Sequence, residues 1–224
     1  MDAQAPNIFA ETVTAVNKLH FAIGGQAILK DLTFSQKAGE HLLLLGASGV
    51  GKTSLINLIT GLASPSGGSV AICGEDMASL SGAARDDLRR RTTGIVFQTL
   101  RLISALSVRD NLRLAQRLAT GSVDDAKVRH LIEAVGITHR ADARPRQLSQ
   151  GEAQRAAIAR ALVGKPRLIV ADEPTSALDD HNAEIVARLL LDRAEEEGAT
   201  LLIATHDQRL KAYLPNSMTL ERPI

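Results

Sequence analysis

The chain has little of what would indicate a disulfide-stabilised protein or a nucleic-acid-binding one. It contains one cysteine in 224 residues, so it can form no internal disulfide. Its 26 Lys and Arg residues are balanced by 25 Asp and Glu residues, so charge does not favour nucleic acid over any other partner, and we expect no nucleic-acid partner. Aromatic residues make up 2% of the chain, which leaves few side chains that can stack on a planar ligand.

Long hydrophobic runs are also missing, although 45% of the residues are hydrophobic. The continuous apolar runs, such as Leu42 to Leu45, are far shorter than the roughly 20 residues that cross a bilayer. Nothing at the N-terminus resembles a signal peptide, so the cytoplasm is the expected compartment. If a membrane is involved, another chain is expected to span it.

Short apolar runs alternate with helical patterns along much of the chain. The runs are continuous rather than alternating, which is typical of strands buried on both faces of a parallel sheet; they cover residues 41–45, 94–97, 168–171 and 200–204. Helical spacing of apolar residues predicts helices over residues 53–60, 153–163 and about 180–197. The fold class predicted from this alternation is α/β.

Two segments depart from this alternation. From Thr12 to Leu45, short apolar segments are broken by turn residues such as Gly24-Gly25, which predicts a small antiparallel β layer. Between Gln98 and Gln147 no strong strand pattern is found, and two amphipathic helices are predicted over residues 108–118 and 124–135. We interpret this second segment as a helical insertion.

A glycine-rich segment connects the first buried strand to the first helix. Gly46-Ala-Ser-Gly-Val-Gly-Lys52-Thr53 matches the pattern G-x-x-x-x-G-K-[ST] in the strand-to-helix context that the pattern requires. Glycines let successive N–H groups point inward, and the helix N-terminus adds partial positive charge, so the loop can cradle phosphates. The alternative is a plain glycine-rich turn with an exposed lysine. The predicted nucleotide-binding residues are Gly46, Ser48, Gly49, Val50, Gly51, Lys52, Thr53 and Ser54.

Candidate metal ligands and catalytic groups lie at the ends of predicted strands. Thr53 is placed to give its hydroxyl to Mg²⁺, and Asp172, at the end of a strand, can reach the same ion. Glu173 follows directly and can polarise an attacking water. His206 and Gln98 each follow another strand; the first can orient the γ-phosphate and water, and the second can touch Mg²⁺ or water. Taken alone, a polar residue after a strand is usually incidental.

The segment Leu148-Ser-Gln-Gly-Glu-Ala-Gln-Arg155 resembles the LSGGQ signature of the ATP-binding cassette (ABC) proteins. Downstream, Ser176-Ala-Leu-Asp179 is similar to the D-loop of this family, with Asp179 at its end. The resemblance makes Gln98 the Q-loop residue and His206 the switch histidine, so the motifs appear in the order of the family. It spans nearly the whole chain, from Phe21, where the family keeps an aromatic that stacks on adenine, to about Asp207.

The resemblance implies a P-loop NTPase (RecA-like) core with an N-terminal antiparallel β subdomain and an inserted α-helical signature subdomain. We expect a single ABC ATPase domain over residues 1–224. Its core and β layer would occupy residues 12–97 and 165–224, and its helical subdomain residues 98–164.

The resemblance also implies a homodimer in which two ATP molecules, with Mg²⁺ as cofactor, are sandwiched head to tail. A signature on a helical insertion then acts in trans. Ser149 and the backbone around Gly151, at a helix start, offer donors to a γ-phosphate held by the second copy. The residues expected to face the ATP of the second copy are Ser149, Gln150, Gly151 and Glu152. Two of them depart from the signature, since Gln150 replaces its first glycine and Glu152 stands at its final glutamine. Gln150 puts the local backbone geometry in doubt.

Between Gly74 and Asn111 the sequence is similar to a subgroup that holds lipoprotein-releasing, macrolide-export and cell-division cassettes. The implied function is an ATPase that works on a separate integral-membrane transporter subunit, peripherally at the cytoplasmic face of the inner membrane. A soluble, non-transport ABC ATPase is the alternative. A nucleotide kinase or switch GTPase could share the phosphate loop, but neither explains the signature.

An apolar loop follows Gln98. Its residues Leu100, Leu102, Ile103 and Leu106 lie where the family seats a coupling helix of the membrane subunit. Core packing of the helical insertion explains the same residues. The sequence leaves both interpretations open.

Overall fold

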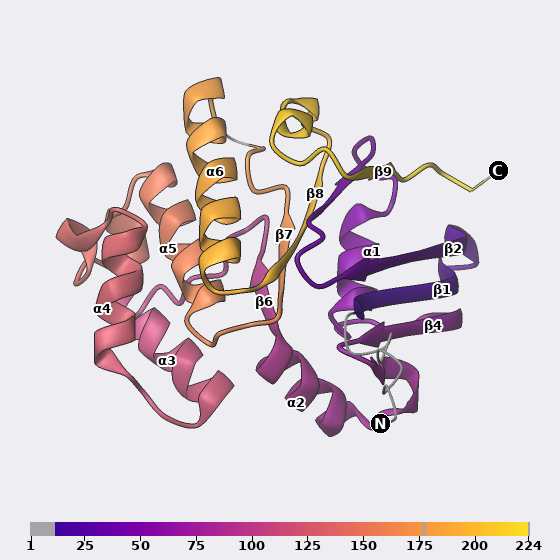
Figure 1. Cartoon of the computed structure of the whole chain (residues 1–224), viewed down its shortest axis with the longest axis horizontal. Helices are drawn as coiled ribbons and strands as arrows, with labels where there is room; N and C mark the ends of the chain where they lie inside the picture. Colours follow the sequence, from indigo (N-terminus) through magenta and orange to yellow (C-terminus); the bar gives the residue numbers. More distant parts are fainter. Residues whose placement is uncertain (1–11, 177, 224) are drawn as a thin grey trace, which may run out of the picture.

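The computed structural model describes residues 12–176 and 178–223, which form two sheets flanked by helices (Figure 1). The predicted α/β fold class is confirmed. The strands are β1 (Thr12–Ile23), β2 (Gln26–Lys37), β3 (Leu42–Leu45), β4 (Gly67–Ile72), β5 (Glu75–Asp76), β6 (Thr93–Val96), β7 (Leu168–Asp172), β8 (Thr200–Thr205) and β9 (Ser217–Thr219). The helices are α1 (Lys52–Ile59), α2 (Gly82–Thr92), α3 (Val108–Thr120), α4 (Asp125–Ala134), α5 (Gln150–Leu162) and α6 (Asp180–Glu196).

The parallel sheet has the strand order β6-β7-β8-β3-β9, and its strands β3, β7 and β8 are buried on both faces. Successive residues of one strand therefore enter different core clusters: Leu43 and Leu45 of β3 belong to one cluster, and Leu42 and Leu44 belong to the other. β7 and β8 alternate in the same way. This explains why their sequences are continuous apolar runs, since an exposed face would have required alternating polar residues.

Helices cover the two faces of the parallel sheet. Figure 1 shows α3 to α6 on one side, and α1 together with the antiparallel sheet on the other. The antiparallel sheet, with the order β2-β1-β4-β5, confirms the β layer predicted for the N-terminal part. The larger core cluster runs from α3, α4 and α5 to β3, β7, β8 and α6. The boundaries of the helical subdomain at residues 98 and 164 stay a prediction.

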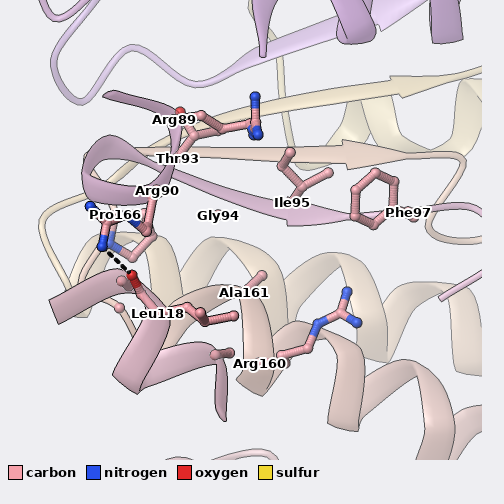
Figure 2. Close-up of a pocket in the computed structure, with 13 residues that line it drawn as sticks. Arg89, Arg90, Thr93, Gly94, Ile95, Phe97, Leu118, Arg160, Ala161 and Pro166 are labelled. Carbon is pink, nitrogen blue, oxygen red and sulfur yellow. Dashed lines mark hydrogen bonds between the residues drawn. The ribbon is translucent and has the colours of Figure 1, made fainter. Parts of the chain in front are cut away.

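β6 and α5 approach each other closely at Gly94. A Cβ at this position would lie 2.2 Å from the carbonyl oxygen of Ala161 on α5 and 3.0 Å from Cγ of Pro166. Figure 2 shows these three residues where the helix passes the strand. Only glycine therefore allows the backbone of α5 to pack directly on β6.

We expect Gly94→Ala to lower the free energy of unfolding by about 3 kcal/mol, because the strand and helix must separate to relieve the overlap. Denaturant unfolding followed by circular dichroism measures the change. Gly82→Ala is the matched control, since a Cβ there meets no atom within 4 Å. Equal stability of the two variants would show that β6 and α5 move apart freely.

Among the described residues, none of the helices combines the length and the apolarity of a membrane-spanning segment.

Candidate nucleotide-binding site

The loop between β3 and α1 forms a pocket of about 320 Å³. Gly49 and Gly51 have φ angles of 74° and 113°, a region of backbone conformation that glycine adopts readily. A Cβ on Gly51 would also lie 2.9 Å from Cγ2 of Ile28. The pocket is lined by Ile28, Ser48, Gly49, Gly51, Lys52, Thr53, Ser54, Gln98 and Glu173. The structure therefore brings together six of the eight predicted loop residues with Gln98 and Glu173.

Three predicted nucleotide-binding residues are not among those that line this pocket. Val50 is 5% exposed and belongs to the core cluster beneath the loop. Gly46 packs under the loop, where an added Cβ would lie 2.7 Å from Val50 and 2.9 Å from the carbonyl oxygen of Leu220. The ring of Phe21 is partly buried against the same cluster. Its contact with adenine stays a prediction, and Ile28 is an apolar neighbour of the site that sequence reasoning missed.

Lys52 is held inside the loop by three acceptors. Its Nζ donates to the carbonyl oxygens of Gly46 (2.7 Å) and Ala47 (3.1 Å), and lies 3.1 Å from Oε1 of Glu173. The side chains of Lys52 and Glu173 are 6% and 9% exposed. An ammonium group has three N–H donors, so all of them are directed to these partners.

Asp172 ends β7 next to the first turn of α1. Its Oδ2 accepts a hydrogen bond from Oγ1 of Thr53 at 2.8 Å, while its buried Oδ1 has no hydrogen-bond partner among the described residues. Burial raises the pKa of Asp172 and the hydrogen bond from Thr53 opposes that shift. An unpaired buried carboxylate oxygen beside a hydroxyl is a donor set that suits a hard cation such as Mg²⁺.

Glu173 occupies a strained turn directly after β7. Its φ is 49°, and its backbone N–H donates to the carbonyl oxygen of Ala204 on β8 at 2.8 Å. Oε2 accepts from Oγ1 of Thr205 at 2.9 Å and lies 3.0 Å from Nδ1 of His206. Positive φ is costly for a residue with a side chain, so these contacts fix a conformation that the chain would otherwise avoid.

Hydrogen bonds keep the Glu173 carboxylate ionised. Burial alone would raise its pKa, but the bonds with His206, Lys52 and Thr205 outweigh that effect and the pKa is lowered. The carboxylate is thus charged at neutral pH, as a group that accepts a proton from water requires.

The signature segment begins α5, which lies on the opposite side of the parallel sheet from α1 (Figure 1). Ser149 caps the helix: its Oγ accepts from the backbone N–H of Glu152 (3.3 Å), while Oε2 of Glu152 accepts from the backbone N–H of Ser149 (2.7 Å). This capping box makes α5 start at Gln150, three residues earlier than predicted. Gln150 is exposed in the first helical turn, so the departure from the signature leaves the helix start regular.

Glu152 is engaged within its own chain. Its Oε1 accepts from Nε of Arg140 at 2.9 Å and lies 3.0 Å from Nε2 of His139, and the residue is 8% exposed. The bond from Arg140, followed by that from the Ser149 backbone, lowers the pKa of Glu152 from 4.5 to about 2. The side chain thus supports the helix start, and Ser149 is exposed at that start.

The depressed pKa of Glu152 predicts a pH-dependent loss of stability. Because its folded-state pKa lies below the ordinary value of 4.5, the carboxylate stabilises the fold above pH 4.5 and loses that contribution as the pH falls toward about 2. Glu152→Gln should therefore be less stable than the parent protein at pH 7. Denaturant unfolding should show that the difference in free energy of unfolding between the parent protein and the variant narrows below pH 4.5. The exposed residue Glu133 provides the control, since Glu133→Gln should have the same free energy of unfolding as the parent protein both at pH 7 and below pH 4.5.

Asp179 lies at the start of α6. Its carboxylate accepts from the backbone N–H and from Nδ2 of Asn182, both at 2.8 Å, and so caps the helix. Within the predicted D-loop segment, residue 177 lies outside the described residues. Asp179 is exposed and is available to a second molecule.

A strand, a glycine loop and a helix that hold a lysine beside two carboxylates define a P-loop nucleotide-binding protein. The family model for the ABC transporter matches residues 29–176. The chain therefore belongs to the ABC transporter family, as the ATPase subunit, and the resemblance seen in its motifs is confirmed. It binds ATP.

Individual relatives agree with this assignment. The chain is 44% identical over 189 residues to the lipoprotein-releasing system ATP-binding protein LolD of Syntrophotalea carbinolica, covering 84% of this chain and 83% of that protein. It superposes with a TM-score of 0.85 and 30% identity on a dimeric, post-hydrolysis structure of the ATP-binding cassette MJ0796 bound to ADP and Pi, covering 93% and 94% of the two chains. It also superposes on CbiO1 of Clostridium perfringens, part of the transporter complex cbiONQ, with a TM-score of 0.83 and 29% identity, covering 94% of this chain and 85% of that chain.

Proposed function

We propose that this chain hydrolyses Mg-ATP as a homodimer and couples hydrolysis to work on a separate integral-membrane subunit, in a system of the lipoprotein-release type. The observation that carries the proposal is the position of Glu173, which contacts Lys52 on one side and His206 on the other. The similarity to a lipoprotein-releasing ATPase supports the subgroup. The proposed location is the cytoplasmic face of the inner membrane, where the chain binds peripherally.

In this proposal the phosphate loop binds the nucleotide and Lys52 neutralises the outer phosphates. Lys52 must exchange at least one of its three present acceptors for a phosphate oxygen. If it releases Glu173, Oε1 of that carboxylate becomes free to accept a proton from water. Ser48 and Ser54 line the pocket and donate to phosphate oxygens.

Thr53, Asp172 and Gln98 would hold Mg²⁺. The hydroxyl and the buried, unpaired carboxylate oxygen are oxygen donors beside the phosphate pocket, and Gln98 lines the same pocket. When bound, the ion supplies positive charge to the phosphates. Glu173 then removes the proton of the attacking water, and His206, which bonds to Glu173, orients this carboxylate and the γ-phosphate.

The second copy completes the site. The N-terminus of α5 presents hydrogen-bond donors to the γ-phosphate of the ATP that the partner subunit binds. These donors are the Ser149 hydroxyl and the backbone N–H groups of Gln150 and Gly151. Glu152 holds that helix start in place rather than reaching the nucleotide. Asp179, exposed at the start of α6, also faces the second copy in this arrangement.

The membrane subunit would bind beside the loop that follows Gln98. A pocket of about 270 Å³ opens here between β6, α3 and α5, and Figure 2 shows Ile95, Phe97 and Arg160 around it. Phe97 lines this pocket while the next residue, Gln98, lines the nucleotide pocket. A partner seated here would therefore act on the loop that carries Gln98.

The loop residues differ in their suitability for this contact. Leu102 packs against the larger core cluster, which favours the core-packing interpretation for that residue, whereas Ile103 is 45% exposed. We expect Ile103→Glu to abolish co-purification with the membrane subunit from detergent-solubilised membranes, while ATP binding by the isolated chain is unchanged. Ile23→Glu is the control, because Ile23 is 58% exposed at the end of β1. Co-purification that survives Ile103→Glu would exclude this loop as the contact.

A further inference from the structure

A chain of hydrogen bonds connects Glu173 to the segment that follows β8. Oγ1 of Thr205 donates to Oε2 of Glu173 (2.9 Å) and accepts from the backbone N–H of Asp207 (3.0 Å). Oδ2 of Asp207 accepts from Oγ1 of Thr175, two residues after Glu173, at 3.0 Å. The side chain of Asp207 is 8% exposed. Its carboxylate thus ties the end of β8 to the end of β7.

Arg209 is the cation of this network. Its backbone N–H and its Nε donate to Oδ1 of Asp207 (3.0 and 2.8 Å), and its Nη2 donates to Oδ2 (2.6 Å). A bidentate guanidinium-carboxylate pair fixes both distance and orientation. The side-chain bond from Arg209 lowers the pKa of Asp207, so the pair stays ionised at neutral pH.

The remaining arm of Arg209 reaches α6. Its Nη1 pairs with Oδ1 of Asp180, the residue directly after Asp179. Arg209 therefore bridges the segment between β7 and α6: it reaches Thr175 by way of Asp207, and it pairs directly with Asp180, the first residue of α6. That segment begins with Glu173 and ends with Asp179.

We propose that Arg209 is a positioning residue for ATP hydrolysis, which holds the segment carrying Thr205 and His206 in register with Glu173 and with the start of α6. The inference rests on the proposed function, in which Glu173 is the base. Glu173 sits at a positive φ, and two of its hydrogen-bond partners come from the segment that Arg209 holds. Release of that segment would let the carboxylate of Glu173 move out of reach of the attacking water.

The main test is the ATPase activity of the isolated chain, measured as phosphate release. We expect Arg209→Ala to lower kcat by about 10- to 100-fold, because small displacements of catalytic groups are costly, while KM for ATP changes by less than about two-fold. Arg209→Lys should recover part of kcat, since lysine keeps the charge but cannot pair with both oxygens of Asp207 in a fixed plane. A purely structural role would not produce this split between kcat and KM.

Asp180 allows a second variant that leaves the pair of Asp207 and Arg209 intact. Its side chain is 92% exposed, so Asp180→Asn should fold normally. If Arg209 acts partly through Asp180, Asp180→Asn lowers kcat, and the double variant loses no more activity than Arg209→Ala alone. Independent, multiplicative losses would contradict the link to α6.

Arg91→Ala is the matched control, because Arg91 forms an ion pair with Asp87 on the exposed face of α2. Its kcat should stay within about two-fold of the parent value, as expected for an exposed pair. The inference is overturned if Arg209→Ala keeps parental kcat, or if activity falls only in proportion to folded protein measured by circular dichroism. Glu173→Gln separates the two proposals. Full turnover by that variant would exclude Glu173 as the base. If Glu173→Gln is inactive but Arg209→Ala is fully active, only the positioning role of Arg209 is excluded.

Discussion

Glu173→Gln should bind ATP with near-parental affinity yet lose at least about 100-fold in turnover, the lower range of general-base contributions. The amide keeps the size of the side chain and can still accept hydrogen bonds, but it cannot take a proton from water. Loss of the negative charge also frees Lys52, whose Nζ now lies 3.1 Å from the carboxylate, to bind phosphate. Binding and catalysis should therefore separate in this single variant.

The same variant should accumulate as an ATP-bound dimer. In the proposed arrangement, hydrolysis of the γ-phosphate removes the group that both copies hold, so a variant that cannot hydrolyse keeps them together. Phosphate release measures turnover, and sedimentation with Mg-ATP measures the dimer. Glu184→Gln, on the exposed face of α6, is the control. Turnover by Glu173→Gln at the parental rate would exclude Glu173 as the base.

Lys52→Ala should act at the binding step. Lysine forms charge-assisted hydrogen bonds with phosphates, and loss of one such group lowers ATP affinity by about 10- to 100-fold. The change also leaves the carboxylate of Glu173, whose side chain is 9% exposed, without the Lys52 ammonium group. Calorimetric titration with Mg-ATP measures the affinity.

Lys37→Ala is the control for Lys52→Ala, because Lys37 is exposed at the end of β2. The two large effects then differ in kind: Lys52→Ala weakens binding, and Glu173→Gln blocks the step after it. Unchanged ATP affinity of Lys52→Ala would show that the backbone N–H groups of the loop suffice for the phosphates, and that Lys52 serves mainly as the partner of Glu173.

The buried strands were the most predictable part of the fold. The four leucines of β3 have to be apolar because each faces one of two cores, so their sequence alone predicts a central parallel strand. α2 was missed because only Leu88 and Thr92 among its residues are buried, which leaves no apolar stripe to recognise. β9 has three residues, and its pairing with β3 depends on a contact far along the chain.

The site residues also divide into those that a local sequence pattern predicts and those that it does not. The phosphate loop was predictable because its residues are contiguous and their spacing has a direct physical reason. The pair formed by Lys52 and Glu173, and the approach of Ile28 to Gly51, join residues from different elements, and no local pattern encodes them. The same is true of Arg209, which looks in the sequence like any charged residue after a strand.

In the proposed dimer, each ATP is held by the phosphate loop of one copy and the signature of the other. Mixing two inactive variants, Ser149→Arg and Glu173→Gln, tests it most directly. In a mixed dimer, one site combines Glu173 from the first variant with Ser149 from the second, and the other site lacks both. We expect the mixture to hydrolyse ATP although neither variant does so alone. A mixture whose turnover equals the sum of the separate variants, despite mixed dimers in sedimentation, would contradict it.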